Sequence, residues 1–154
     1  MKLKQQIKAD TKEAMKARNQ TVVSVLRMVS AKVLEREVEL RRSKGRDYEL
    51  NDEETIAVIS AYAKQRRQSI ESYREAGRDD LVTQEQSELE IVQKYLPRQL
   101  AEEEIQKIVE ETIREIGASG PQAMGQVMRA VMPKLKGAAD GKTVNALVRQ
   151  TLAG

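Results

Sequence analysis

Residues 22–40 read VVSVLRMVSAKVLEREVEL, and the order of their apolar side chains decides the expected fold. One set recurs every three or four residues, as one face of an α-helix does: Val22, Val25, Leu26, Val29, Val33 and Leu40. Val23, Met28 and Leu34 add a second apolar face. A helix that is apolar on two faces is typical of a bundle interior, so we expect this helix to be central.

Similar helical spacing continues through the rest of the chain and predicts an all-α protein. Only three prolines and eight glycines interrupt 154 residues, and the stretches between them do not alternate as strands do. Pro97 ends the fourth expected helix, because a residue that precedes proline disfavours the α conformation. We therefore predict two helical subdomains, an N-terminal bundle of about four helices at 1–96 and a C-terminal bundle of about three at 97–154.

The composition removes several classes of catalytic site. The chain has no His and no Cys, so its side chains cannot form a His-based triad, a Cys nucleophile or a thiolate zinc site. Asp79-Asp80 and Glu102-Glu103-Glu104 fall at expected helix starts, where capping and the helix dipole account for acidic residues. We therefore expect no catalytic residue, no bound metal and no cofactor.

The chain is also poor in aromatic residues, with four Tyr and neither Phe nor Trp. Four rings are too few for the stacking platforms that read single-stranded bases. If the chain binds nucleic acid, we expect it to contact the backbone and follow the shape of a folded RNA. No DNA specificity is expected.

Charge is unevenly distributed although the net charge is only +3. Residues 1–46 carry 13 Lys and Arg against five Asp and Glu, and residues 117–154 carry five against one, whereas the middle of the chain is acidic. This pattern is typical of polyanion binding, although solvated helix faces also produce it. The candidate RNA-binding residues are Arg129, Lys134, Lys136, Lys142 and Arg149, and a secondary basic ladder comprises Lys64, Arg66 and Arg78.

Three further charged residues fall on apolar stripes and need partners. Arg67 and Arg74 share the direction of an apolar stripe formed by Ile56, Ala63 and Ile70. Glu85 lies on the apolar stripe of the next helix. Antiparallel packing of these helices predicts a structural ion pair between Glu85 and either Arg67 or Arg74, and the alternative is a functional anion site.

Several motifs occur together, in order, over nearly the whole chain. They are Val25-Leu26-Arg27-Met28, Lys64-Gln65-Arg66-Arg67-Gln68-Ser69, Ala76-Gly77-Arg78-Asp79-Asp80-Leu81, Lys94-Tyr95-Leu96-Pro97-Arg98-Gln99-Leu100, Ile116-Gly117-Ala118, Met124-Gly125-Gln126-Val127-Met128 and Lys134-Leu135-Lys136-Gly137-Ala138-Ala139-Asp140-Gly141. Their combination resembles the YqeY-like (GatB/YqeY) family. Ala101 is a departure, since relatives often have a Ser-type cap at this helix start.

The resemblance implies two all-α subdomains, similar to the tail of the B subunit of the tRNA-dependent amidotransferase, which helps to hold tRNA. A related domain is appended to some bacterial glutaminyl-tRNA synthetases. The implied partners are therefore tRNA and either an aminoacyl-tRNA synthetase or an amidotransferase. The amidotransferase's catalytic cradle is a separate domain, so the resemblance to the tail does not imply amide ligation by this chain.

Three hypotheses about function remain open. The chain is a tRNA-binding accessory module, a subunit of a glutamine-dependent carbon-nitrogen ligase, or a helical scaffold for protein partners. No run approaches the ~18 apolar residues of a membrane helix, and Met1-Lys2-Leu3-Lys4 leads into polar residues, so we expect a cytoplasmic protein without a membrane partner.

Overall fold

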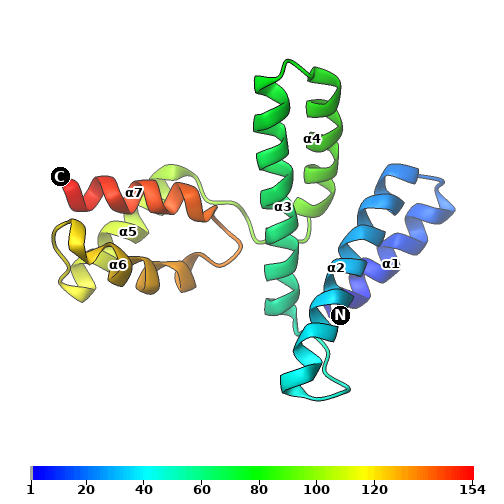
Figure 1. Ribbon diagram of the computed structural model, residues 1–154, viewed down its shortest axis with the longest axis horizontal. Coiled ribbons are helices and arrows are strands. Elements are labelled where there is room, and N and C mark those ends of the chain that lie inside the picture. The colour runs from blue at the N-terminus through cyan, green and yellow to red at the C-terminus, as the bar shows by residue number, and fades with distance from the viewer. Residues whose placement is uncertain (1) are drawn as a thin grey trace. The chain divides into compact units, whose positions relative to one another are not determined.

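The computed structural model describes residues 2–154, and within this range the chain is helical and has no strand (Figure 1). The α-helices are α1 (Leu3–Lys16), α2 (Gln20–Lys44), α3 (Asp52–Glu75), α4 (Asp79–Gln93), α5 (Glu102–Ile116), α6 (Met124–Val131) and α7 (Gly141–Ala153). Two short 3₁₀ turns, η1 (Pro121–Ala123) and η2 (Met132–Leu135), flank α6. The all-α prediction is confirmed. Helix α4 ends before Pro97, because the chain already turns at Lys94 and Tyr95.

Contacts divide the described chain into two units, one that ends at Leu96 and one over Pro97–Gly154. Each unit has its own apolar core. The core of the first is formed by Ile7, Val25, Leu26, Val29, Ile59, Tyr62, Ala63 and Val92. The core of the second is formed by Ile105, Val109, Ala123, Val127, Val131, Leu135, Val144, Val148 and Leu152.

Helix α2 contacts each of the other three helices in the first unit, while α3 and α4 run side by side as a hairpin (Figure 1). Four residues of the expected main stripe of α2 are buried, namely Val25, Leu26, Val29 and Val33, whereas Val22 and Leu40 are only partly buried. The expected second apolar face is wrong at two positions, because Met28 and Leu34 are 50% and 54% exposed. The neighbouring helices cover the main stripe and leave these two side chains uncovered.

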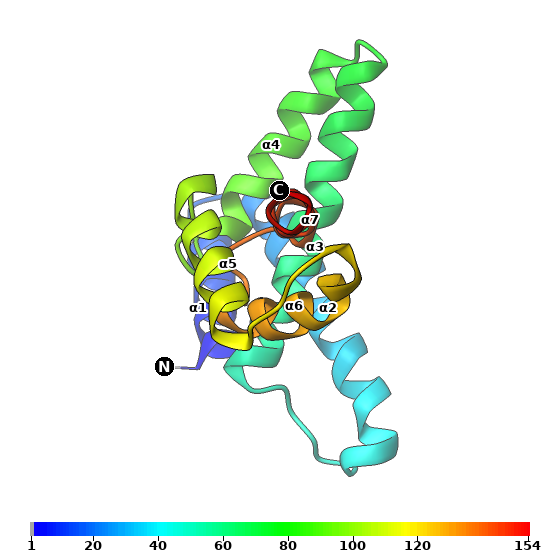
Figure 2. The same cartoon turned by 90° about the vertical axis from the view of Figure 1, so that its left-hand side faces the viewer.

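The second unit packs α5, α6 and α7 against one another, and Figure 2 looks nearly along α7 with the other two helices beside it. Gly117 ends α5 with a φ of 65°, a left-handed conformation that glycine adopts without strain. Pro133 lies in η2, where the chain leaves α6 and inserts Leu135 into the core. The backbone N–H of Leu100 donates to the carbonyl of Ala138, which holds the loop after η2 against the start of the unit.

Helix α5 begins without a side-chain cap at Ala101. Glu104 supplies half of a capping box, because its carboxylate accepts from the Ala101 N–H at 3.2 Å. Replacing Ala101 by Ser adds the missing acceptor and should raise the free energy of unfolding by about 0.5 to 1 kcal/mol. Urea denaturation monitored by circular dichroism would measure the gain. Replacing Ala101 by Val, which brings no acceptor, is the control, and an equal gain there would contradict the capping account.

Candidate nucleic-acid interface

The exposed side of α7 carries two of the candidate RNA-binding residues. Lys142 and Arg149 are seven residues apart, so they lie on one face two turns apart, separated by about 10 Å along the helix axis. Their face is turned away from the buried stripe of α7, which is formed by Val144, Val148 and Leu152. Ala146, one turn after Lys142, is also exposed and is too small to cover the space between the two cations. We call Lys142, Ala146 and Arg149 the α7 ridge.

Local contacts hold the start of the ridge and its second cation in place. Asp140 caps α7 by accepting a hydrogen bond from the backbone N–H of Lys142 at 3.4 Å. Arg149 donates to the side-chain carbonyl of Asn145 at 3.3 Å, and this amide partner is uncharged. The ridge therefore presents two exposed cations from a rigid, capped helix.

The other three candidates of the second unit lie elsewhere on its surface. Arg129 is exposed on α6, while Lys134 and Lys136 are exposed in and just after η2. Lys134 donates to Thr112 and forms an ion pair with Glu115, both on α5 and both at 2.9 Å. Its charge is therefore balanced within the unit, which makes Lys134 a weaker candidate for a phosphate contact than Arg149.

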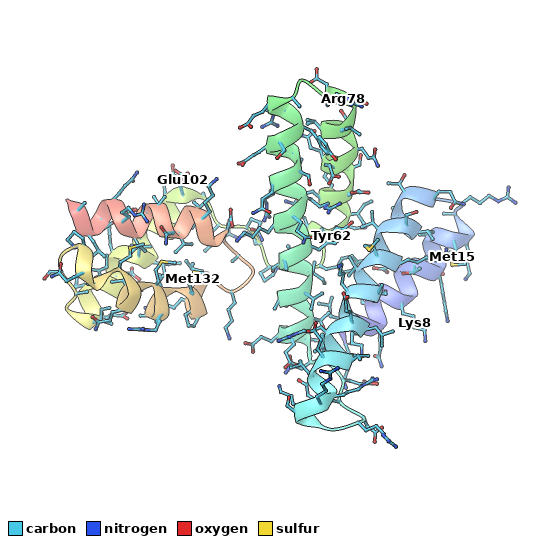
Figure 3. The ribbon with its side chains drawn as sticks, in the orientation of Figure 1. Lys8, Met15, Tyr62, Arg78, Glu102 and Met132 are labelled. Carbon is cyan, nitrogen blue, oxygen red and sulfur yellow. The ribbon has the colours of Figure 1, made fainter. Side chains whose placement is uncertain are left out.

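The structure does not join the secondary basic ladder into one cationic surface. Arg78, at the turn between α3 and α4 (Figure 3), donates twice to Asp80 at 3.1 and 3.2 Å. Arg66 forms ion pairs with Glu85 and Glu88 on α4, at 3.3 and 3.2 Å. Lys64 is exposed on α3. Two of the three cations are thus paired with carboxylates, and this acidic part of the chain is a poor site for phosphate.

The structure also corrects the expected ion pair between α3 and α4. Glu85 pairs with Arg66, whereas Arg74 is exposed and the described ion pairs of Glu85 do not include Arg67. The expected stripe runs through Ile56, Ala63 and Ile70, but the buried stripe of α3 is Ile59, Tyr62, Ala63 and Ile70. At 100° per residue, Arg66 points within about 20° of Ile59, near the centre of that stripe, whereas Arg67 points about 80° away, at its edge.

Sequence reasoning alone does not find two residues of this cluster. Glu88 is one turn after Glu85 and brings a second carboxylate to the same guanidinium. Tyr62 places its ring 4.8 Å from the Arg66 guanidinium carbon, a cation–π contact. The three-residue spacing of Glu85 and Glu88 in the sequence could have indicated that Glu88 lies on the same side of α4 as Glu85. Since two acids share one cation, the cluster does not offer Arg66 to an external anion.

Burial raises the pKa of Glu85, and the charge of Glu88 adds to this effect, while Arg66 opposes it. Arg66 Nε and Glu85 Oε2 have no hydrogen-bond partner within the described residues. The ion pair is therefore close in distance but incompletely satisfied in geometry. Both observations indicate that the fold disfavours the ionised form of Glu85.

Neither a metal site nor a membrane-spanning helix is found within residues 2–154. No group of three or more Asp or Glu side chains there is arranged to hold a metal ion. None of the described helices is both long and apolar enough to cross a membrane.

Comparison with known proteins finds relatives over nearly the whole chain and over parts of it. Altered inheritance of mitochondria protein 41, mitochondrial, of Pyrenophora tritici-repentis is 29% identical over 150 residues, which cover 95% of this chain and 78% of that protein. The protein of the same name from Eremothecium gossypii is 35% identical over 90 residues, or 58% of this chain and 46% of that protein.

A shorter match has a different name. The E subunit of the glutamyl-tRNA(Gln) amidotransferase of Thermococcus sibiricus is 47% identical over 57 residues, which cover 34% of this chain and only 9% of that protein. The family described as Yqey-like protein matches residues 4–152, nearly the full length of the chain. The chain therefore belongs to the YqeY-like family.

Proposed function

We propose that this chain is a tRNA-binding accessory module, linked to tRNA-dependent amidation or aminoacylation and not catalytic by itself. The observation that carries the proposal is the α7 ridge, in a segment that has five cations and one acid over residues 117–154. Cationic side chains on a rigid helix suit the phosphate contacts that dominate nucleic-acid affinity. The partial similarity to an amidotransferase subunit whose name includes tRNA supports the same class of ligand.

The five candidate residues contribute unequally to the proposed interface. Lys142 and Arg149 form the main contact, and Arg129 and Lys136 extend the cationic surface on α6 and after η2. Lys134 contributes less because Glu115 already balances its charge. An aminoacyl-tRNA synthetase or an amidotransferase is the proposed protein partner, and the cytoplasm is the proposed location.

The alternative, a subunit of a glutamine-dependent carbon-nitrogen ligase, rests on the same similarity to an amidotransferase subunit. That similarity covers 9% of the larger protein, and the described residues of this chain include no group of three or more carboxylates that could hold a metal ion. Binding is therefore the better supported of the two proposals.

The test is a charge reversal with a control of equal charge. In the ridge variant, Lys142→Glu and Arg149→Glu are combined, and in the control variant Lys107→Glu and Arg114→Glu are combined on α5. Both pairs are exposed and seven residues apart, so both variants change the net charge equally. The ridge variant should bind folded tRNA at least tenfold more weakly, and its slope of log affinity against log salt should fall by about two, at roughly 0.9 per phosphate. The control variant should lose much less tRNA affinity, and its salt slope should change less.

Filter binding of a labelled tRNA transcript between low and physiological salt would give both quantities. Melting should show the ridge variant folded, because Glu at position 142 lies at the N-terminus of α7, where the helix dipole favours an anion. Equal losses in the two variants would mean that binding follows net charge and not the ridge. Unchanged binding in the ridge variant would move the interface to the basic residues of α1 and α2.

A further inference from the structure

A second exposed surface lies along the α1–α2 hairpin, and it combines apolar and cationic side chains. A groove of about 420 Å³ runs between the two helices. Its lining includes Lys4, Ile7, Lys8, Lys12, Val33 and Leu34. The groove is large enough for several side chains of a partner.

The apolar part of this surface continues beyond the groove in both directions. Leu34 and Val38, one turn apart on α2, are each 54% exposed. Met15, labelled in Figure 3, is 51% exposed on α1. Its sulfur lies 3.9 Å from an Arg27 nitrogen, near the turn that joins α1 to α2. The groove together with Met15, Leu34 and Val38 is called the hairpin face below. Three of the four exposed large apolar side chains in the described part of the chain, Met15, Leu34 and Val38, lie on it.

The cationic part forms a ladder on α1. Lys4, Lys8 and Lys12 follow one another at four-residue intervals, so they lie about 6 Å apart along one side of the helix. The acid that lines the groove is Glu37, which is 3% exposed and engaged by Lys4 and Arg41. Glu37 balances the charge of Lys4, so a ligand on the hairpin face meets apolar side chains bordered by the positive charges of Lys8 and Lys12.

This combination suits a protein helix better than RNA. Exposed apolar patches rimmed by polar residues are typical of protein interaction sites, and an amphipathic helix in an apolar groove is a recurring mode of recognition. Phosphates would gain nothing from Leu34 and Val38, and the residues lining the groove include no aromatic ring on which a base could stack. The lysine ladder then selects the charge of the partner.

We propose that the hairpin face binds an amphipathic helix of a partner protein, one edge of which is acidic. Apolar side chains at positions i, i+3 or i+4, and i+7 of that helix cover Leu34, Val38 and the groove. Acidic side chains one turn apart on its edge lie against Lys8 and Lys12. This inference is independent of tRNA binding, because it uses other residues and another class of ligand.

The test uses two synthetic helical peptides of about five turns, or 18 residues. Both carry the same Leu stripe, and their edges carry Glu in one and Lys in the other. Fluorescence anisotropy should show that the Glu peptide binds the full chain at least tenfold more tightly than the Lys peptide. This preference should shrink as salt is raised, because the charged contacts are exposed.

Three variants locate the site. Leu34→Asp should weaken binding of the Glu peptide at least tenfold, since it removes an apolar anchor at the groove. Met28→Asp is the matched control, because Met28 is as exposed on α2 as Leu34 but does not line the groove. Combining Lys8→Glu with Lys12→Glu should reverse the preference, so that the Lys peptide binds more tightly than the Glu peptide.

Equal affinity for the two peptides, or equal losses in Leu34→Asp and Met28→Asp, would overturn the proposal. The proposal would also be overturned if the variant at Lys8 and Lys12 bound both peptides as before but no longer bound tRNA. These two lysines would then be RNA contacts. Circular dichroism of each variant separates these outcomes from unfolding.

Discussion

Replacing Arg66 by Met should lower the free energy of unfolding by about 3 kcal/mol, whereas replacing Glu85 by Gln should leave it unchanged or raise it slightly. Arg66 is the cation placed between Glu85 and Glu88, and the three side chains are 23%, 13% and 20% exposed. Removing the arginine leaves two partly buried carboxylates facing each other. Removing the charge of Glu85 leaves Arg66 paired with Glu88. Met keeps most of the aliphatic packing against Tyr62, so the loss reports the charge.

The pH dependence gives this prediction a second measurement. Burial raises the pKa of Glu85 above its usual value near 4.5, so the folded state binds its proton more readily than the unfolded state. Glu85 therefore lowers stability when it is ionised, and this penalty is relieved as the pH falls towards the unfolded pKa. Urea denaturation at pH 7 and near pH 5 should show the difference between Glu85→Gln and the parent protein shrinking at the lower pH. If Glu85→Gln lowered the free energy of unfolding as much as Arg66→Met, ionised Glu85 would be stabilising the fold, which would contradict this prediction.

The helices were predictable because their signals are local. Asn51-Asp52-Glu53-Glu54 predicts the start of α3, and in the structure Asn51 accepts from the Glu54 N–H at 2.8 Å while Glu54 accepts from the Asn51 N–H. The rotation of a helix about its axis is harder to predict. Apolar residues at seven-residue spacing favour a stripe near Arg67, and one residue of error turns a side chain by about 100°. Packing against α4 selects Arg66.

For the candidate surfaces too, local properties of the sequence are predictable and contacts between distant residues are not. The excess of cations in residues 117–154 is a property of composition and can be counted directly. The ion pair between Lys134 and Glu115 cannot be predicted from composition, because the two residues are 19 positions apart on different elements. The exposure of Leu34 also escapes prediction, since an apolar pattern shows which side chains favour burial but not whether the chain supplies enough neighbours to cover them.

Glu37 carries the other large expected effect. This carboxylate lies in the buried stripe of α2 and is 3% exposed. It accepts from the ammonium of Lys4 on α1 and from the backbone N–H of Leu50 at 3.1 Å, and Arg41 lies 3.7 Å away. Because Leu50 is also buried, Glu37 ties α1, α2 and the segment before α3 together.

Glu37→Ala should therefore lower the free energy of unfolding by about 3 kcal/mol, because it leaves the buried Leu50 N–H without an acceptor and leaves the Lys4 ammonium with only the exposed Glu49, 3.9 Å away. Glu37→Gln keeps an oxygen for the Leu50 N–H and should cost about half as much. Replacing Glu39, which is exposed and pairs with Arg36, by Ala is the matched control on the same helix and should change stability by less than about 0.5 kcal/mol. Urea denaturation at pH 7 would rank the three variants.

The titration of Glu37 should run opposite to that of Glu85. Burial by itself would raise its pKa, but the hydrogen bonds from Lys4 and Leu50 and the charges of Lys4 and Arg41 outweigh burial and lower the pKa below 4.5. The ionised carboxylate then stabilises the fold at every pH above the unfolded pKa, and this contribution is lost as the pH falls through the folded pKa. The stability difference between the parent protein and Glu37→Gln should thus be constant from pH 7 to about pH 5 and shrink below about pH 4.5. A difference that grows on acidification would mean that Glu37 is held in the fold as a neutral acid, and that the Lys4 and Arg41 contacts do not stabilise its charge.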